Sequence, residues 1–307
     1  MELRHLRYFI AVAEERHITR AAERLGMQQP PLSQQIKLLE AQLGFALFRR
    51  LPRGVELTEA GRMFLRDAKA LLSDLDAAAE RAARAAQGME GAVAIGFTTS
   101  AAAHSYAPGL LRAFRSACPR VALQLKEDNA GRLTEALVEG KLDVALLRAP
   151  VTRPAGLAFH TILQEPLLLA LPADHRLAAS PKAVSLRLLQ AEEFILVRQP
   201  GASGMYSDLL AACGQLGFVP RIAAEVGRML TNISMVAAGL GVSIVPASMR
   251  GFHPDRVAYR ELCDAPGLVA PMSLVYREEN TNRAAENFIA LVRETPPETL
   301  QSASAAP

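Results

Sequence analysis

The sequence predicts a mixed α/β protein with an all-α winged N-terminal segment, a long linker helix and a two-lobed α/β domain. Apolar residues first recur at helical spacing, a segment almost free of helix breakers follows, and short apolar strands then alternate with helical patterns. A chain of 307 residues accommodates about two or three domains. The expected parts are 1–58 (the N-terminal segment), 59–88 (the linker helix), 89–295 (the α/β domain) and 296–307 (a disordered tail).

The N-terminal segment carries the pattern of three short helices. Residues 3–13 place apolar side chains at helical spacing. The second helix opens with Thr19 as a candidate N-cap, and Gly26 is placed to end it. The third starts at Gln29-Pro30-Pro31, because proline is tolerated in a first helical turn, where the amide hydrogen it lacks would be unpaired. Helix, short turn, helix is the arrangement of a DNA-binding helix-turn-helix, although a plain three-helix bundle has the same periodicity.

A basic wing follows the third helix and favours DNA binding over the plain bundle. Residues 48–58 indicate two short strands joined by a Pro-Arg-Gly turn, with arginines near its tip. Such a wing is suited to grip the phosphates that flank a major-groove contact.

The charge distribution points to the same segment. The net charge of the chain is only +3, too small to identify a nucleic-acid binder. Residues 1–66 nevertheless carry eleven basic and seven acidic side chains, whereas the remainder carries 23 and 24. The excess positive charge therefore lies where a phosphate-facing surface needs it.

Between residues 58 and 87 a heptad pattern indicates a linker helix. Apolar positions alternate spacings of three and four, with charged side chains on both flanks: Leu65, Ala68, Leu72, Leu75, Ala79, Ala82 and Ala86. A dimerising coiled coil fits this pattern, and so does a long helix packed against a core.

The α/β domain shows strand and helix patterns in alternation, which predicts parallel sheets covered by helices in two lobes. The first lobe comprises residues 89–163 and 267–295, and the second comprises residues 164–266. Separate strands are expected at 157–163 and 167–171, with the chain crossing between the lobes around Gln164-Glu165-Pro166.

The N-terminal motifs resemble those of LysR-type transcriptional regulators over some 60 residues almost without a gap. The matching segments are Ile18-Thr19-Arg20-Ala21-Ala22-Glu23-Arg24-Leu25, Gln29-Pro30-Pro31-Leu32-Ser33-Gln34-Gln35-Ile36, Leu39-Glu40, Leu43-Gly44, Leu47-Phe48-Arg49-Arg50 and Leu57-Thr58-Glu59-Ala60-Gly61. The layout of the remaining chain agrees with this family, closest to its muconate-responsive members of aromatic catabolism.

The resemblance implies a winged helix-turn-helix and an effector domain with a periplasmic-binding-protein-like (type 2) fold, with the ligand between the lobes. It also implies a homodimer through the linker helix, commonly paired into a homotetramer, on double-stranded promoter DNA. The matching DNA-contact positions are Gln29, Pro30, Pro31, Ser33, Gln34, Arg50 and Arg53. Relatives often carry Arg at position 34, so Gln34 departs from the family, and a solvated helix face is its alternative.

Candidate effector-binding residues follow predicted strands. Thr99 and Ser100 stand between a strand and a helix, where hydroxyls and free amides can hold an anion, although ordinary helix capping uses the same residues. Arg148 ends an apolar strand and can pair with a carboxylate, unless it is a surface or interface arginine. Ser203 and Gly204 belong to a second amide-rich loop, and Asn129 is a weaker candidate that capping also explains.

The sequence favours a small-molecule-binding regulator over an enzyme. No G-x-S-x-G elbow surrounds Ser100, and the His and Cys residues lack metal-ligand spacing, so no catalytic residue, metal or cofactor is expected. Charges near the N-terminus argue against a signal peptide, and no membrane partner is expected, which predicts a cytoplasmic protein. The effector is expected to be a small anion, such as an aromatic or dicarboxylic acid. The remaining alternatives are a protein-association bundle and a hydrolase that uses Ser100.

Overall fold

The computed structural model describes residues 1–148, 153–198 and 204–302, without the side chains of residues 204, 205, 301 and 302. The described residues divide into two compact units, Met1–Ala83 and Arg84–Pro307, called here the N-terminal and the C-terminal unit. Among the described helices, none combines the length and the apolar character needed to cross a bilayer.

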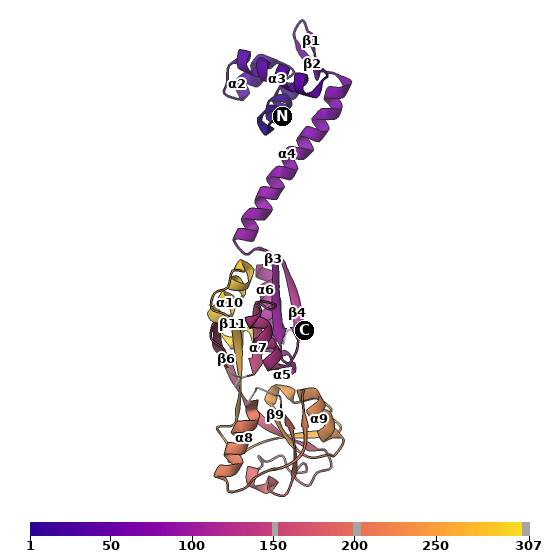
Figure 1. Ribbon diagram of the computed structural model, residues 1–307. Helices are drawn as coiled ribbons and strands as arrows, with labels where there is room; N and C mark the ends of the chain where they lie inside the picture. The colour runs from indigo at the N-terminus through magenta and orange to yellow at the C-terminus, as the bar shows by residue number, and fades with distance from the viewer. Residues whose placement is uncertain (149–152, 199–203, 303–307) are drawn as a thin grey trace. The chain divides into compact units, whose positions relative to one another are not determined.

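The N-terminal unit has the predicted helices and wing. Its elements are α1 (Leu3–Glu15), α2 (Ile18–Arg24), α3 (Gln29–Leu43), β1 (Phe48–Leu51), β2 (Gly54–Leu57) and most of α4 (Glu59–Ala86) (Figure 1). Its core joins α1 to α3 through side chains such as Phe9, Leu32 and Leu39, which are fully buried. The apolar spacing of these helices is therefore explained by one shared core.

The starts of α2 and α3 have no side-chain cap hydrogen bond. Gly44 ends α3 in the left-handed region, as its position predicts. Thr19 is not the N-cap of α2: that place belongs to His17, whose backbone is extended, and Thr19 lies inside the helix. Helix α2 begins as early as Ile18 because Arg16, with a left-handed φ of 52°, ends α1 directly before it.

Helix α4 confirms the predicted long helix. In its first half Ala68 is buried, and Leu65 and Leu72 pack partly against the core of the N-terminal unit. Leu71 and Leu75 remain exposed, as do the later alanines of the heptad pattern. One chain thus uses only the first part of the pattern for its own packing.

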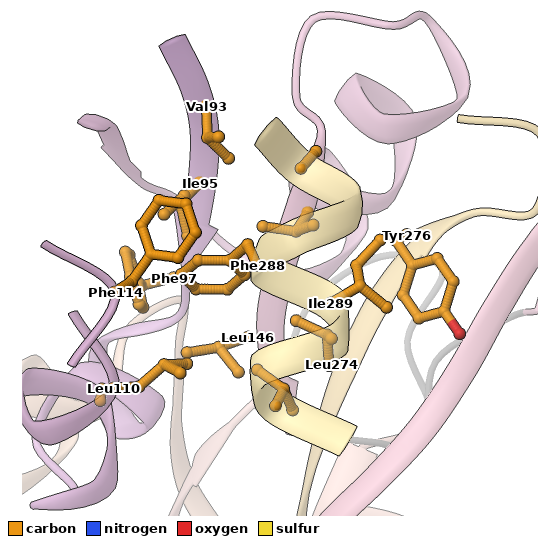
Figure 2. Packing of buried hydrophobic residues seen from close by; sticks show 14 of the residues in the cluster. Val93, Ile95, Phe97, Leu110, Phe114, Leu146, Leu274, Tyr276, Phe288 and Ile289 are labelled. Carbon is orange, nitrogen blue, oxygen red and sulfur yellow. The ribbon is translucent and has the colours of Figure 1, made fainter. Parts of the chain in front are cut away.

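The first lobe of the C-terminal unit is a sheet covered by helices. Its elements are β3 (Glu90–Phe97), α5 (Thr99–Ala102), α6 (Tyr106–Ala117), β4 (Arg120–Glu127), α7 (Ala130–Val138), β5 (Val144–Arg148), the first half of β6 (Leu157–Pro172), β11 (Val269–Arg277) and α10 (Arg283–Glu294). Figure 2 shows Phe288 of α10 toward Phe97 of β3 and Ile289 beside Tyr276 of β11. The Phe288 ring meets Phe114 edge-on, with the ring centroids 5.1 Å apart.

The second lobe has its own core. Its elements are the second half of β6, η1 (Leu186–Leu189), β7 (Glu193–Val197), α8 (Gly204–Gln215), β8 (Arg221–Val226), α9 (Met229–Ala237), β9 (Ser243–Pro246), η2 (Ala247–Met249) and β10 (Val257–Glu261). Leu169, Phe194 and Leu186 are fully buried there.

The sheets are mixed, which corrects the prediction of parallel sheets. Strand β3 pairs in parallel with β4 and β5, and β7 pairs in parallel with β8. Strands β6 and β11 instead run antiparallel to each other, and β11 to β5. The alternation of strands and helices indicated parallel connections. Strand β6 instead leaves the first lobe for the second and β11 returns beside it, so the two pair antiparallel.

The two strands expected at 157–163 and 167–171 are a single strand. In β6 the backbone stays extended through Gln164 to Pro166, because β11 runs beside it and pairs Ala270 with Glu165. Proline is compatible with extended backbone where no ladder hydrogen bond needs its amide. Leu167 belongs to the core of the second lobe, so the lobes are joined by continuous strands.

The predicted disordered tail is wrong for the residues that the structure describes. Helix α11 (Pro297–Ser302) buries Leu300 in the core of the first lobe. Gly109 of α6 makes this possible, because a Cβ there would overlap the Leu300 backbone carbonyl. The many small residues of this segment suggested disorder, but Leu300 is an apolar side chain that packs in the core. Residues 303–307 lie outside the described part.

Candidate functional site

Helix α3 leaves the predicted DNA-contact residues exposed or half-buried, away from or beside its buried face. Leu32 and Ile36 face the core, whereas Pro30, Pro31 and Gln34 are exposed and Gln29 and Ser33 are half-buried. The prolines occupy the first turn, as the sequence predicts. The exposed first turn of α3 can therefore offer amide and hydroxyl groups to base edges.

Gln35, which neighbours this surface, has a structural partner. Its side-chain oxygen lies 2.9 Å from Nε2 of His5, which is buried on α1. Gln35 is therefore not simply a solvated side chain, whereas Gln34 is exposed and free to contact DNA. No sequence pattern indicates this pair, because its partners are 30 residues apart.

The wing carries exposed cations. Strand β1 pairs with β2 in antiparallel register, which sets Arg49 opposite Glu56, and the two form an ion pair of 2.6 Å. Arg50 and Arg53 are exposed and, within the described residues, have no ion-pair partner. Their charges are available to phosphates.

In the C-terminal unit, Arg148 lies at the boundary of the lobes with its charge already paired. It ends β5, as predicted, and only 7% of its surface is exposed. Its guanidinium forms an ion pair with Glu165 of β6 and donates to the carbonyls of Ser100, at 3.1 Å, and Ala270, at 3.0 Å. Arg148 is thus neither a surface arginine nor an open anion site in this arrangement.

Glu165 connects Arg148 to the second lobe. Its carboxylate accepts hydrogen bonds from the Ser248 amide at 2.6 Å and from the Ser248 hydroxyl at 2.9 Å. Glu165 is 6% exposed, and Ser248 belongs to η2. Burial lowers the pKa of Arg148 and the Glu165 charge opposes this, so the guanidinium stays protonated. From the sequence, Glu165 was expected where the chain crosses between the lobes, but no role was predicted for it.

The hydroxyl residues at the start of α5 include one that contacts this pair, because the Ser100 carbonyl accepts from Arg148. Ser100 is buried, and Thr99 donates to Glu127 at 2.6 Å. Glu127 in turn lies 3.7 Å from Arg228 of the second lobe. Thr98 is the N-cap of α5 without a side-chain cap bond, so capping does not account for these hydroxyls.

Polar atoms at this boundary remain unsatisfied. Among the described groups, Nε of Arg148 and Oγ1 of Thr98 are buried without a hydrogen-bond partner. Buried polar groups are nearly always paired, by protein, water or ligand. These two atoms therefore remain able to form a further hydrogen bond each.

His104 lies in the electrostatic field of the same pair. It is half-buried, and its Nδ1 accepts a hydrogen bond from the Tyr106 amide at 3.1 Å. Burial lowers its pKa, the Glu165 charge acts in the opposite direction, and the Arg148 charge lowers it further.

The other predicted effector residues are not brought to this cluster by the contacts described. Asn129 caps α7 by accepting from the Arg132 amide at 2.8 Å, which is its capping alternative. Gly204 begins α8, and Ser203 lies outside the described residues. In the described ranges, no group of three His, Cys, Asp or Glu side chains could hold a metal ion.

Two protein-family models match this chain, one over most of each unit. The model described as "Bacterial regulatory helix-turn-helix protein, lysR family" matches residues 3–62, and "LysR substrate binding domain" matches residues 86–297. The chain belongs to the LysR family of transcriptional regulators. It is a DNA-binding regulator with an effector-binding domain, and not an enzyme.

Named relatives span nearly the whole chain. The chain is 43% identical to the transcriptional regulator YnfL of Escherichia coli (strain K12), over 94% of this chain and 96% of YnfL. It is 39% identical to the transcriptional regulator AlsR of Bacillus subtilis (strain 168), over 94% of each. The crystal structure of full-length CbnR complexed with its target DNA has a TM-score of 0.83 at 32% identity, covering 95% of this chain and 99% of CbnR. The predicted family and fold are confirmed.

Proposed function

We propose that α3 and the wing contact one promoter site together. Gln29, Pro30, Pro31, Ser33 and Gln34 face base edges and backbone, while Arg50 and Arg53 hold the flanking phosphates. The exposed polar face of α3 and the unpaired wing charges support this assignment. The site of action is the cytoplasm, where bacterial DNA lies.

Dimers form through α4 in this proposal, and pairs of dimers form a homotetramer. The exposed Leu71 and Leu75 support the first contact, because a single chain leaves them uncovered.

The effector is proposed to be a small carboxylate that replaces Glu165 as the partner of Arg148. The observation that carries this is the buried Arg148–Glu165 pair at the lobe boundary, beside Ser100 and the unsatisfied Thr98 hydroxyl. An arginine pairs with a carboxylate in a bidentate geometry, so an external acid can take the place of the internal one. Aromatic acids and muconate are the finer choice that the family resemblance suggests.

The exchange would change the contact between the lobes. Glu165 holds Ser248 of the second lobe through two hydrogen bonds, so its release from Arg148 alters both ends of that contact. A ligand shifts a conformational equilibrium only through different affinities for the two states. An acid that binds where Glu165 has moved aside meets this condition.

Footprinting of the DNA upstream of the gene, with and without benzoate, muconate and succinate, tests the regulator. We expect protection that changes with one of these acids. Gel-shift titration of Arg50→Ala and Arg53→Ala checks the wing, since loss of a phosphate contact weakens binding to all sequences and lowers the salt slope by about 1. Unchanged binding by both variants would disprove the wing assignment.

Calorimetry with the acid found by footprinting tests the effector site. Arg148→Ala is expected to lose binding, and an affinity equal to wild type would show that the acid binds elsewhere. Arg176→Ala is the control, because Arg176 is an exposed arginine whose charge is already paired with Glu192.

A further inference from the structure

The wing must be held in place by contacts outside its own strands. A two-stranded hairpin is only marginally stable alone, so its direction depends on the surfaces against which it is anchored. One anchor lies near the turn between α1 and α2, where the Val55 amide donates to the Arg16 carbonyl at 2.9 Å. This contact fixes the wing to α1, but it does not fix the wing to the helix that faces the bases.

Glu40 of α3 supplies the second anchor. One of its carboxylate oxygens accepts hydrogen bonds from the amides of Leu47, at 2.8 Å, and Phe48, at 3.0 Å. These amides belong to the start of the wing, and Leu47 is fully buried. The Leu47 carbonyl accepts from the Thr58 amide at 2.9 Å, so both strand ends are tied to the same point.

The charge of Glu40 is unfavourable for DNA binding by itself. A carboxylate near a phosphate surface lowers affinity through simple electrostatics, and this one stands on the helix that carries the proposed base contacts. A carboxylate at this place is explained by its two amide contacts, because charged acceptors form stronger hydrogen bonds than neutral ones.

We infer that Glu40 is a positioning residue for DNA binding: it sets the wing relative to α3, so that base contacts and wing phosphate contacts form together. This inference rests on the proposed wing contact. The inference predicts a change in DNA affinity opposite to simple electrostatics: removal of a negative charge from the DNA-binding helix lowers the affinity instead of raising it.

The test combines Glu40 variants of the full chain with Arg53→Ala. Affinity for the footprinted upstream duplex and for a random-sequence duplex is measured over a salt series. We expect Glu40→Ala to bind about tenfold more weakly, with a salt slope lower by about 1. Arg53→Ala should lower the slope by about 1 with Glu40 in place and change little in the Glu40→Ala background.

Matched variants separate positioning from charge and from folding. Glu40→Gln keeps an oxygen in reach of both amides and is expected to restore the Arg53 effect. Glu40→Asp keeps the charge but shortens the reach, and it serves where Glu40→Ala does not fold at the assay temperature. Glu23→Ala removes an exposed carboxylate from α2 and should bind as well as wild type or better.

The outcomes are distinguishable. An Arg53 effect of equal size in wild type, Glu40→Ala and Glu40→Asp overturns the positioning role while leaving the wing contact intact. An Arg53→Ala variant without effect in the wild-type background overturns the wing contact itself, and the role of Glu40 with it.

Discussion

The two units place their key arginines in opposite environments. In the N-terminal unit, Arg50 and Arg53 are exposed on a short wing. In the C-terminal unit, Arg148 is buried and holds a carboxylate of the same chain. Exposed cations bind a polyanion through screened, additive charge, whereas a buried arginine is costly without a partner. The difference distinguishes a basic surface that is free to meet DNA from a buried charge that already has a partner.

The largest effect is expected from removing the buried partner. Glu165→Ala leaves Arg148 charged without its counterion, and the free energy of unfolding should fall by about 3–5 kcal/mol. Urea denaturation followed by circular dichroism measures this. The double variant Arg148→Met with Glu165→Leu is the control and should recover most of the loss, since a buried apolar pair is often as stable as an ion pair. A loss below about 1 kcal/mol would indicate a solvated surface pair like Arg49–Glu56 of the wing.

A backbone change on the wing should cost less. Gly54 has a φ of 113°, and a Cβ there would overlap the Arg16 carbonyl oxygen, so Gly54→Ala should lower stability by about 1–3 kcal/mol. Gly26→Ala is the matched control, because its φ is also positive but a Cβ would meet nothing within 4 Å. Thermal denaturation compares the melting temperatures of the two variants. Equal values would mean that a Cβ at Gly54 is accommodated without a clash with the Arg16 carbonyl.

A single exposed amide on α3 should affect specificity without affecting stability. Gln34→Ala is expected to lose about 1–3 kcal/mol of discrimination at one base pair. Binding to a set of single-base operator variants measures this loss. Gln35→Ala serves as the control, since Gln35 contacts His5. A Gln34→Ala variant with an unchanged base preference would assign Gln34 to a solvated helix face.

The smallest effect concerns pH. Burial holds the pKa of His104 below its usual 6.5, so the unfolded chain binds more protons between the two values. The stabilising contribution of neutral His104 is complete above 6.5 and declines as pH falls toward the folded-state pKa. His104→Asn should remove this part of the pH dependence. In Glu165→Gln the pKa of His104 should fall further, because Glu165 raises it, and an NMR titration that shows no change would place His104 away from the pair.

Local features of the fold could be predicted from the sequence. The helices of the N-terminal unit, the wing and α4 depend on periodicity and on breakers such as Gly44, which act within a few residues. Strand β6 could not be predicted as one element, because its extended course through Pro166 depends on β11, about a hundred residues later. Leu300 likewise becomes ordered only by reaching a glycine on α6.

The candidate site shows the same limit. Arg148 could be located at a strand end from its apolar neighbours, but its pairing with Glu165 and Ser248 depends on strand register and on the crossing of the lobes. The amide contacts of Glu40 could not be predicted from the sequence either, because a hydrogen bond to a backbone amide requires no particular residue type at the donor.

Titration of small carboxylates into three forms of the full chain tests most directly whether an effector replaces Glu165. Benzoate, muconate and succinate are titrated calorimetrically into wild type, Arg148→Ala and Glu165→Gln. If an external carboxylate replaces Glu165 at Arg148, the acid that binds wild type should bind Glu165→Gln more tightly. The reason is that a neutral amide competes less strongly for the guanidinium. Arg148→Ala should not bind the acid. Equal dissociation constants in all three forms would contradict the exchange.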